Sequence, residues 1–519
     1  MAYPEPANVA PWYLRNITQA LELNEATGQV FVRTNAVVGN ITVGNVTVGN
    51  VGINSLGNVD ISGNTLPVTI VGNLAGITGN IGGITGNVTI VDGGGSITVD
   101  GNVGITGTVN ATITGGNVST TIGGTNLDAF GRLRVSEPYT LFDSQNLYID
   151  GDQFANLTAN SGSVTYVANQ SSFNLAVSAA NGSSVIRQCR TTQAYQPGKS
   201  LLVMNTFAMA ALIAGCRQRV GYFTDKNGVY FEADGETLYL VIRSSTTGTV
   251  VEERIAQSSW NGDRLTGAGG ATNPSGITLN PTLTQILWSD IEWLGVGNVR
   301  AGFVINGVFI VCHTFQHANQ SGNTTVYMTT ATLNPRYEIT NTSATGGART
   351  MKQICSTVIS EGGYNPQTKI NYVPTAIAPT RITTGNVFTS LASIRLNPAY
   401  PDAVVVPSQI DLLLVDVQYG TFQLVLNASN VVANTGSWSN AVSSVVQYNS
   451  SALRIGDGTV VYSGLTSSRD TLAISEDLKR RLQLSRTANG TPDILTLCVA
   501  YQSNNADLLW KFGWEELTN

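Results

Sequence analysis

Charged residues are scarce in this chain of 519 residues. Only 12% are Asp, Glu, Lys or Arg, against about a quarter in a typical globular protein. A disordered tail needs charge and few apolar groups, and a nucleic-acid-binding surface needs clustered Lys and Arg. This sequence has neither, and its formal net charge is only −6. The low charge argues against a disordered protein and predicts that the chain binds no nucleic acid.

Cysteine is also scarce, with five residues scattered along the chain and none in a C-x-x-C pair. An odd, scattered set indicates thiols in a reducing cytoplasm and not a disulfide framework. Residues 1–6 lack the basic and apolar stretches of a signal peptide. No apolar stretch approaches the ~20 residues that span a bilayer. We therefore expect a protein that is made and assembled in a cytoplasm and that does not enter a membrane.

Residues 35–126 lack Lys, Arg, Glu, Cys and every aromatic residue. What remains is mainly Val, Ile and Thr, which favour strands, broken by Gly-Asn pairs, which favour tight turns. Strands this short, with side chains this small, cannot fill a thick core, so the repeats must stack around a narrow axis. We predict a slender β-repeat stalk, either a single-chain solenoid or three intertwined chains, and we prefer the three-chain form. A flexible linker is the alternative, but linkers are rich in Ser, Pro and charge.

Residues 1–34 form a segment too small to fold a core of its own. Two alternating runs, at 20–23 and 29–33, flank a loop containing Gly28 and predict a β-hairpin. The candidate anchor precedes them and comprises Trp12, Tyr13, Leu14 and Arg15. Apolar groups that cannot be buried internally are usually buried against a partner. We expect this segment to attach the protein to a larger particle.

After residue 127 aromatic residues return, with short alternating runs between strong turn signals. Asp234-Gly235 and Asn306-Gly307 each separate two such runs and predict β-hairpins. Two later runs flank a Gly-containing turn in the same style, at residues 410–417 and 421–426.

Helical signals are confined to one candidate, residues 475–482, with an N-cap Ser and early acids. Many short strands with so little helix predict an all-β protein with antiparallel sandwiches of jelly-roll type. We expect a larger sandwich at residues 127–365 and a smaller one at residues 366–519.

Residues that could form a catalytic or metal site are few and unsuitably spaced. His313 and His317 are the only histidines, and in a strand they would stand ~13 Å apart, too far for one metal. A polysaccharide-cleaving enzyme needs paired carboxylates, but Glu252 and Glu253 would point to opposite faces of a strand. We predict no catalytic residue, no metal and no cofactor, with a polysaccharide depolymerase as a rival hypothesis.

Two tryptophans are the best candidates for exposed rings that stack on sugar. Trp260 stands beside residues 261–263 in a Gly-rich loop, and Trp438 stands in the polar stretch 434–440. Burial in a core is the alternative for both rings.

The stretch NLDAFGRLRVSEPYTLFDSQ, residues 126–145, resembles a stretch of uncharacterised structural proteins of tailed bacteriophages, notably aquatic ones. The block at residues 293–319 is similar to the same group, and the resemblance covers about the middle half of the chain. It implies a virion component, a fibre. Because its motifs have no established chemistry, no functional residue carries over.

Together these features predict a non-catalytic virion fibre, assembled in the host cytoplasm as a homotrimer. Its N-terminal segment binds other virion proteins of the capsid, neck or tail, and its sandwiches attach to a host surface glycan or receptor. A capsid or neck decoration protein that binds nothing on the host is the alternative hypothesis.

Overall fold

The computed structural model describes only part of the chain. The described residues are 21–24, 26, 29–32, 137–148, 151–267, 269–373, 378–415, 419–428, 438–450, 456–466, 469–474, 479 and 481–517. The chain divides into two units, residues 1–117 and 118–519. The candidate anchor, residues 12–15, and the predicted stalk, residues 35–126, lie outside the described residues.

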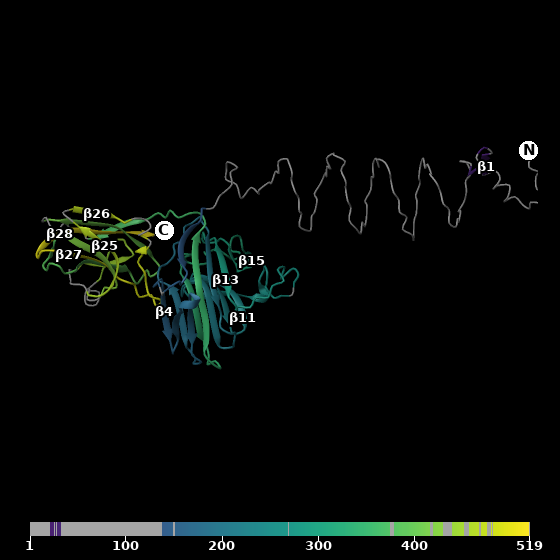
Figure 1. The fold of residues 1–519 in the computed structure, drawn as a ribbon, viewed down its shortest axis with the longest axis horizontal. Helices are drawn as coiled ribbons and strands as arrows, with labels where there is room; N and C mark the ends of the chain where they lie inside the picture. The colour runs from purple at the N-terminus through teal and green to yellow at the C-terminus, as the bar shows by residue number, and fades with distance from the viewer. Residues whose placement is uncertain are drawn as a thin grey trace, which may run out of the picture. The chain divides into compact units, whose positions relative to one another are not determined.

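The first unit contains one described element, an antiparallel hairpin (Figure 1). Strand β1 (Leu21–Asn24) pairs with β2 (Gln29–Val32), with Leu21 opposite Val32 and Asn24 opposite Gln29. The hairpin predicted around Gly28 is therefore confirmed.

The second unit begins with a large antiparallel β-sandwich. One sheet has seven strands, in the order β12 (Val251–Ala256), β11 (Thr237–Ser244), β10 (Gly228–Asp234), β9 (Cys216–Phe223), β16 (Pro335–Asn341), β7 (Ser184–Cys189) and β4 (Phe154–Ala159). The other has eight, in the order β15 (Val308–Phe315), β14 (Val299–Ile305), β13 (Gln285–Ile291), β8 (Leu201–Ala208), β17 (Arg349–Ser360), β6 (Ser172–Val177) and β5 (Ser163–Val167), with β3 (Tyr139–Ser144) also paired to β17. Two short 3-10 turns, η2 (Ala168–Gln170) and η3 (Gln257–Ser259), follow β5 and β12.

Neighbouring strands of these sheets are often far apart in the sequence, as in a jelly roll. In one sheet β16 lies between β9 and β7, and in the other β17 lies between β8 and β6. The sheets bury their facing side chains in one core. Phe231 of one sheet and Phe303 of the other meet edge to face, with ring centroids 5.2 Å apart, and neither is exposed. Burying a side chain of this size stabilises the fold by about 1.5–3 kcal/mol.

The two-residue turns behave as their sequences predict. The turn between β14 and β15 holds Asn306 at φ 53° and Gly307 at φ 78°. Both values lie in the left-handed region that a tight hairpin turn requires, which Asn and Gly tolerate best. Between β10 and β11 the turn residues are Gly235, at φ 62°, and Glu236, one position later than the predicted Asp234-Gly235, because Asp234 pairs with Thr237 as the last residue of β10. Both predicted hairpins are confirmed.

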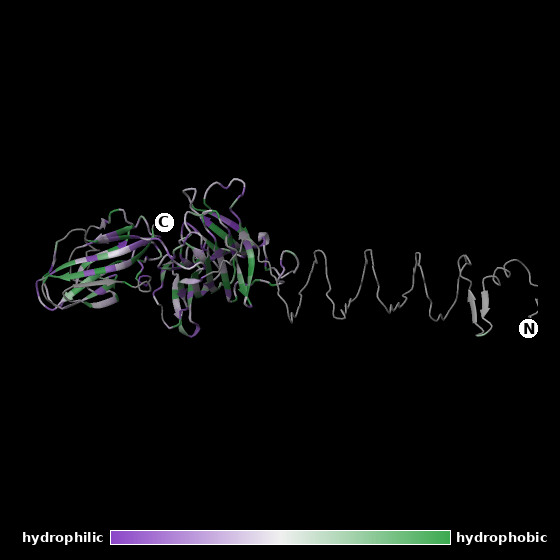
Figure 2. Cartoon of the chain, turned by 90° about the horizontal axis from the view of Figure 1, so that it is seen from above, coloured by the Kyte–Doolittle hydropathy of each residue, from purple (hydrophilic) through white to green (hydrophobic). Residues whose placement is uncertain are grey.

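A second, smaller sandwich follows. Its five-stranded sheet has the order β18 (Lys369–Val373), β28 (Ala506–Leu517), β21 (Val404–Leu414) and β26 (Arg469–Ala473), with β19 (Thr380–Ile382) also paired to β28. Its six-stranded sheet has the order β23 (Ser439–Asn440), β24 (Val446–Asn449), β20 (Thr389–Leu396), β27 (Leu495–Tyr501), β22 (Gly420–Leu426) and β25 (Thr459–Thr466). A separate hydrophobic core, which includes Leu412, Leu424 and Phe512, fills it. Figure 2 shows hydrophobic and hydrophilic residues intermixed along the strands of both sandwiches.

The second sandwich differs from expectation at one connection. The runs at 410–417 and 421–426 flank a Gly-containing turn, but their strands, β21 and β22, do not pair with each other. Strand β21 pairs with β26 and β28, whereas β22 pairs with β25 and β27 in the opposite sheet. The chain therefore changes sheets between Leu414 and Gly420. In the helical candidate only Lys479, Arg481 and Leu482 are described, and the first two have helical backbone.

All five cysteines are free thiols. Burial raises the pKa of Cys189 and of Cys216 to about 11, so neither is a reactive thiolate at neutral pH. Within the described residues, no helix has the length and hydropathy needed to cross a bilayer.

Candidate functional site

Polar contacts join the two sandwiches of the second unit. The backbone N–H of Arg486 donates to the carbonyl of Arg190 at 3.1 Å. The Gln483 side chain donates to the carbonyl of Thr192 at 2.8 Å. The Arg486 guanidinium, only 4% exposed, donates to Asp402 at 2.6 Å and to Asn334 at 3.5 Å. Hydrogen bonds from Gln483 and Arg486 therefore connect this segment of the second sandwich to the first sandwich.

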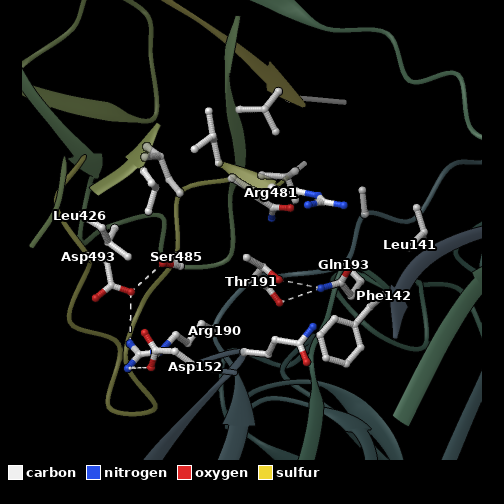
Figure 3. A pocket seen from close by; sticks show the side chains of 18 of the residues that line it. Leu141, Phe142, Asp152, Arg190, Thr191, Gln193, Leu426, Arg481, Ser485 and Asp493 are labelled. Atoms are coloured by element: carbon white, nitrogen blue, oxygen red, sulfur yellow. Dashed lines mark hydrogen bonds and ion pairs between the residues drawn. The ribbon is translucent and has the colours of Figure 1, made fainter. Parts of the chain in front are cut away.

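Beside these contacts lies a pocket of about 640 Å³ (Figure 3). Its lining combines apolar side chains, such as Phe142, Val404 and Leu482, with polar ones from both sandwiches. Concave sites with apolar walls and a few convergent polar groups are typical of ligand-binding sites.

One polar group of the pocket is centred on Arg190. Its guanidinium forms ion pairs with Asp152 at 2.9 Å and with Asp493 at 3.4 Å. The buried Asp493 carboxylate also accepts hydrogen bonds from Ser485 at 2.6 Å and from Asn427 at 2.9 Å. These bonds satisfy a buried charge and hold the pocket wall rigidly. Both carboxylates are thus engaged in bracing Arg190.

Arg481 differs from Arg190 in having no acidic partner among the described residues. It lines the pocket and is exposed, and no hydrogen bond or ion pair links it to any described residue. Figure 3 shows its guanidinium apart from the Arg190 group. A guanidinium presents several N–H donors in a plane, which suits carboxylate, phosphate and other oxygen-rich ligands. Arg481 is therefore the side chain of the pocket best placed to bind such a ligand.

A larger cluster of charged side chains lies elsewhere in the described residues, on the outer face of the seven-stranded sheet. Arg219 of β9 donates to Glu232 of β10 at 2.6 Å and also pairs with Glu252 and Glu338. The remaining members of this charged layer are Arg243, Arg254, Arg336 and Asp234. The layer balances four cations against four anions and covers Phe223 and Tyr230, which are 0% and 1% exposed.

Opposing effects set the pKa values in this layer. Burial alone would raise the pKa of Glu338, but Arg336, Arg219 and Arg243 together lower it below its ordinary value. At Glu252, burial likewise raises the pKa, but Arg243 and Arg219 outweigh this effect, so the pKa of Glu252 is also lowered. Carboxylates held in the charged form this way are poor general acids. The layer forms an ion-pair network over the buried rings of Phe223 and Tyr230.

The two histidines serve separate packing roles. His313 accepts a hydrogen bond from the Asn261 backbone at 3.2 Å, and burial lowers its pKa. His317 stacks on Tyr327 with ring centroids 3.9 Å apart. Among the described residues, no three His, Cys, Asp or Glu side chains are grouped as a metal site would require.

The expectation that Trp260 is an exposed sugar-stacking ring is wrong. Trp260 is 1% exposed, belongs to the first core, and donates its indole N–H to the carbonyl of Ile255 at 3.0 Å. The polar, Gly-rich sequence around it forms a loop that folds back over β15, with Gly262 donating to the Cys312 carbonyl at 2.9 Å. The loop therefore carries the tryptophan inward.

Trp438 is half-buried and lies beside β23, on the second sandwich. The Arg395 guanidinium lies over its ring, 4.1 Å from the centroid. The structure therefore does not bring the two tryptophan candidates together.

Sequence reasoning missed the pocket residues Arg190, Arg481 and Asp493. Arg190 and Asp493 are 303 positions apart, so no local pattern joins them. One signal for Arg481 was available, namely three consecutive basic residues, 479–481, in a chain with few charges.

No protein-family model matches this chain, and no curated protein matches it. Among solved structures it is similar to a protein of unknown function from Shewanella oneidensis MR-1, at 8% identity and TM-score 0.30 over 44% of this chain and 88% of that one. It is also similar to the CBM2 module of the evolved Dit of Lactobacillus casei BL23 phage J-1, at 6% identity and TM-score 0.28 over 44% and 99%. Peanut lectin is similar at 12% identity and TM-score 0.26 over 44% and 100%. These TM-scores are too low to assign a function.

Proposed function

We propose that this chain is a non-catalytic fibre protein of a tailed-phage virion whose sandwiches bind a host-surface glycan in the pocket around Arg481. The observation that carries the proposal is the exposed Arg481 guanidinium in a pocket of about 640 Å³ with rigid, braced walls. A pocket of this size accommodates a few sugar units, and a rigid wall limits the entropy lost on binding.

The fibre part of the proposal is supported by the sequence outside the described residues. Residues 35–126 have the composition of a slender β-repeat stalk, and a stalk of that kind is stable when three chains share one axis. Residues 12–15 supply apolar groups for attachment to other virion proteins.

A glycan array probed with the full chain tests the proposal. We expect binding to a restricted set of glycans, which Arg481→Gln weakens at least tenfold. Arg381→Gln is the matched control, because Arg381 is an exposed arginine that already pairs with Asp507. Equal binding by wild type and Arg481→Gln would exclude this pocket as the receptor site.

The rival functions give different results in the same samples. A decoration protein would bind no host glycan, whereas a depolymerase would release reducing sugar from host polysaccharide. Sustained release of reducing ends by the wild-type chain would contradict the non-catalytic assignment.

A further inference from the structure

A row of polar side chains crosses three strands at one margin of the six-stranded sheet. Arg395 of β20 is opposite Gln447 of β24, and Gln447 is opposite Asn440 of β23. Residues opposite one another in antiparallel strands project from the same face of the sheet. The three side chains therefore form one continuous row, which ends at the edge strand β23.

Hydrogen bonds fix this row in place. The Nε and Nη2 atoms of Arg395 both donate to Oε1 of Gln447, at 3.0 and 2.9 Å. The Gln447 amide donates to Oδ1 of Asn440 at 3.0 Å, and the Asn397 amide donates to the same atom at 3.3 Å. The guanidinium and the amides are thus oriented before any ligand arrives.

Trp438 completes the row, which we call the Arg395 row. Its ring lies under the Arg395 guanidinium at 4.1 Å, an arrangement in which the ring face stabilises the cation. The Trp438 indole N–H is buried and has no hydrogen-bond partner in the described parts of the chain. Buried donors are nearly always paired in a native structure, so this one requires an explanation.

Arg395 lacks an acidic partner. Among the described residues, no carboxylate forms an ion pair with Arg395. Its Nε and Nη2 atoms donate to Gln447, and Nη1 donates to no described residue, so the guanidinium edge formed by Nη1 and Nη2 is open to a ligand. Burial lowers the pKa of Arg395, because its half-buried charge is poorly hydrated. A desolvated cation without a counter-ion is costly to maintain, and a ligand anion would offset that cost.

We propose that the Arg395 row is a second glycan site, specific for sugars that carry a carboxylate, such as a hexuronate. This inference rests on the proposed glycan-binding function but not on the Arg481 pocket. The free edge of the guanidinium donates two parallel N–H bonds to the sugar carboxylate, and the exposed Asn440 amide donates to a ring hydroxyl. A single guanidinium matches the one negative charge of a carboxylate. A phosphate carries about −1.5 to −2 and usually recruits several cations.

Titration of the full chain with a hexagalacturonate tests the site, with maltohexaose as the neutral probe of equal length. We expect the acidic hexasaccharide to bind and to change tryptophan fluorescence, and maltohexaose to bind at least tenfold more weakly. Arg395→Gln should weaken hexagalacturonate binding at least tenfold. Arg395→Lys should recover little, because lysine keeps the charge but not the planar pair of donors.

Three further variants separate a binding role from a structural one. Trp438→Phe should abolish the fluorescence change while calorimetry still detects binding. Asn440→Ala, at an exposed residue, should weaken binding without lowering the melting temperature. Arg381→Gln, an exposed arginine of the same sandwich, should bind as wild type does.

The outcomes separate this site from the pocket. Loss of hexagalacturonate binding in Arg395→Gln but not in Arg481→Gln supports the Arg395 row. If Arg481→Gln loses hexagalacturonate binding and Arg395→Gln keeps it, the acidic sugar binds in the pocket. That result would overturn the inference while leaving the proposed function intact. Absence of binding by the wild type, equal binding of the neutral probe, or preference for a phosphorylated sugar would each overturn it as well.

Discussion

Replacement of Glu232 by Gln should destabilise the first sandwich strongly. Glu232 is 0% exposed and accepts hydrogen bonds from Arg219 at 2.6 Å and from the Nε of Arg254 at 2.7 Å. Glu232→Gln keeps the shape but removes the charge. Removing one partner of a buried ion pair costs about 3–5 kcal/mol. Because Arg219 retains Glu338 and Glu252, we expect the lower end, about 3 kcal/mol.

Calorimetric melting of the full chain measures this effect. At about 2–4 °C per kcal/mol for a domain of ~200 residues, the transition of the first sandwich should fall by about 6–12 °C. Asp152→Asn is the matched control, because the Asp152 side chain is 68% exposed in its pair with Arg190, which also pairs with Asp493, and surface pairs contribute about 1 kcal/mol or less. If both variants melt within about a degree of wild type, the charged layer does not stabilise the fold as argued.

Three other predictions follow from the same reasoning. The pKa values of Glu338 and Glu252 lie below their ordinary value of 4.5, so the free energy of unfolding should be highest above that pH and fall as pH drops through the lowered values. Urea unfolding at about pH 6 and about pH 3 checks this, and no loss at the lower pH would contradict it. If residues 35–126 form the proposed three-chain stalk, Val48→Asp should lower protease resistance and trimer melting, because the charge would be buried on the shared axis at a cost of several kcal/mol, while Thr47→Asp should change neither. A chain lacking residues 1–34 should remain a soluble trimer that particles fail to incorporate, and normal incorporation would refute the anchor.

The strands and their hairpins were largely predictable, because the physics that forms them is local. Asn306, Gly307 and Gly235 hold the left-handed turn geometry that residues of these types favour between apolar runs. Which sheet a strand joins was less predictable. Strands β21 and β22 have the same local signal as a hairpin, yet they join opposite sheets, because non-local pairings with β28 and β27 decide their places.

The candidate site was much less predictable than the fold. Trp260 was misplaced because a polar loop sequence does not reveal whether its one large apolar side chain turns inward. The pocket depends on side chains from both sandwiches, such as Arg190 and Arg481, whose proximity exists only after folding. Trp438 was singled out as an aromatic ring, but the Arg395 row beside it emerged only from strand register.

The central claim is that this chain is a projecting fibre of a virion, and electron microscopy of labelled particles tests it most directly. An antibody against residues 366–519, bound to intact particles, should mark the outer ends of fibres that project from the capsid, neck or tail. Label spread evenly over the capsid shell would contradict the fibre and favour a decoration protein. Particles that carry no label at all would contradict a virion role altogether.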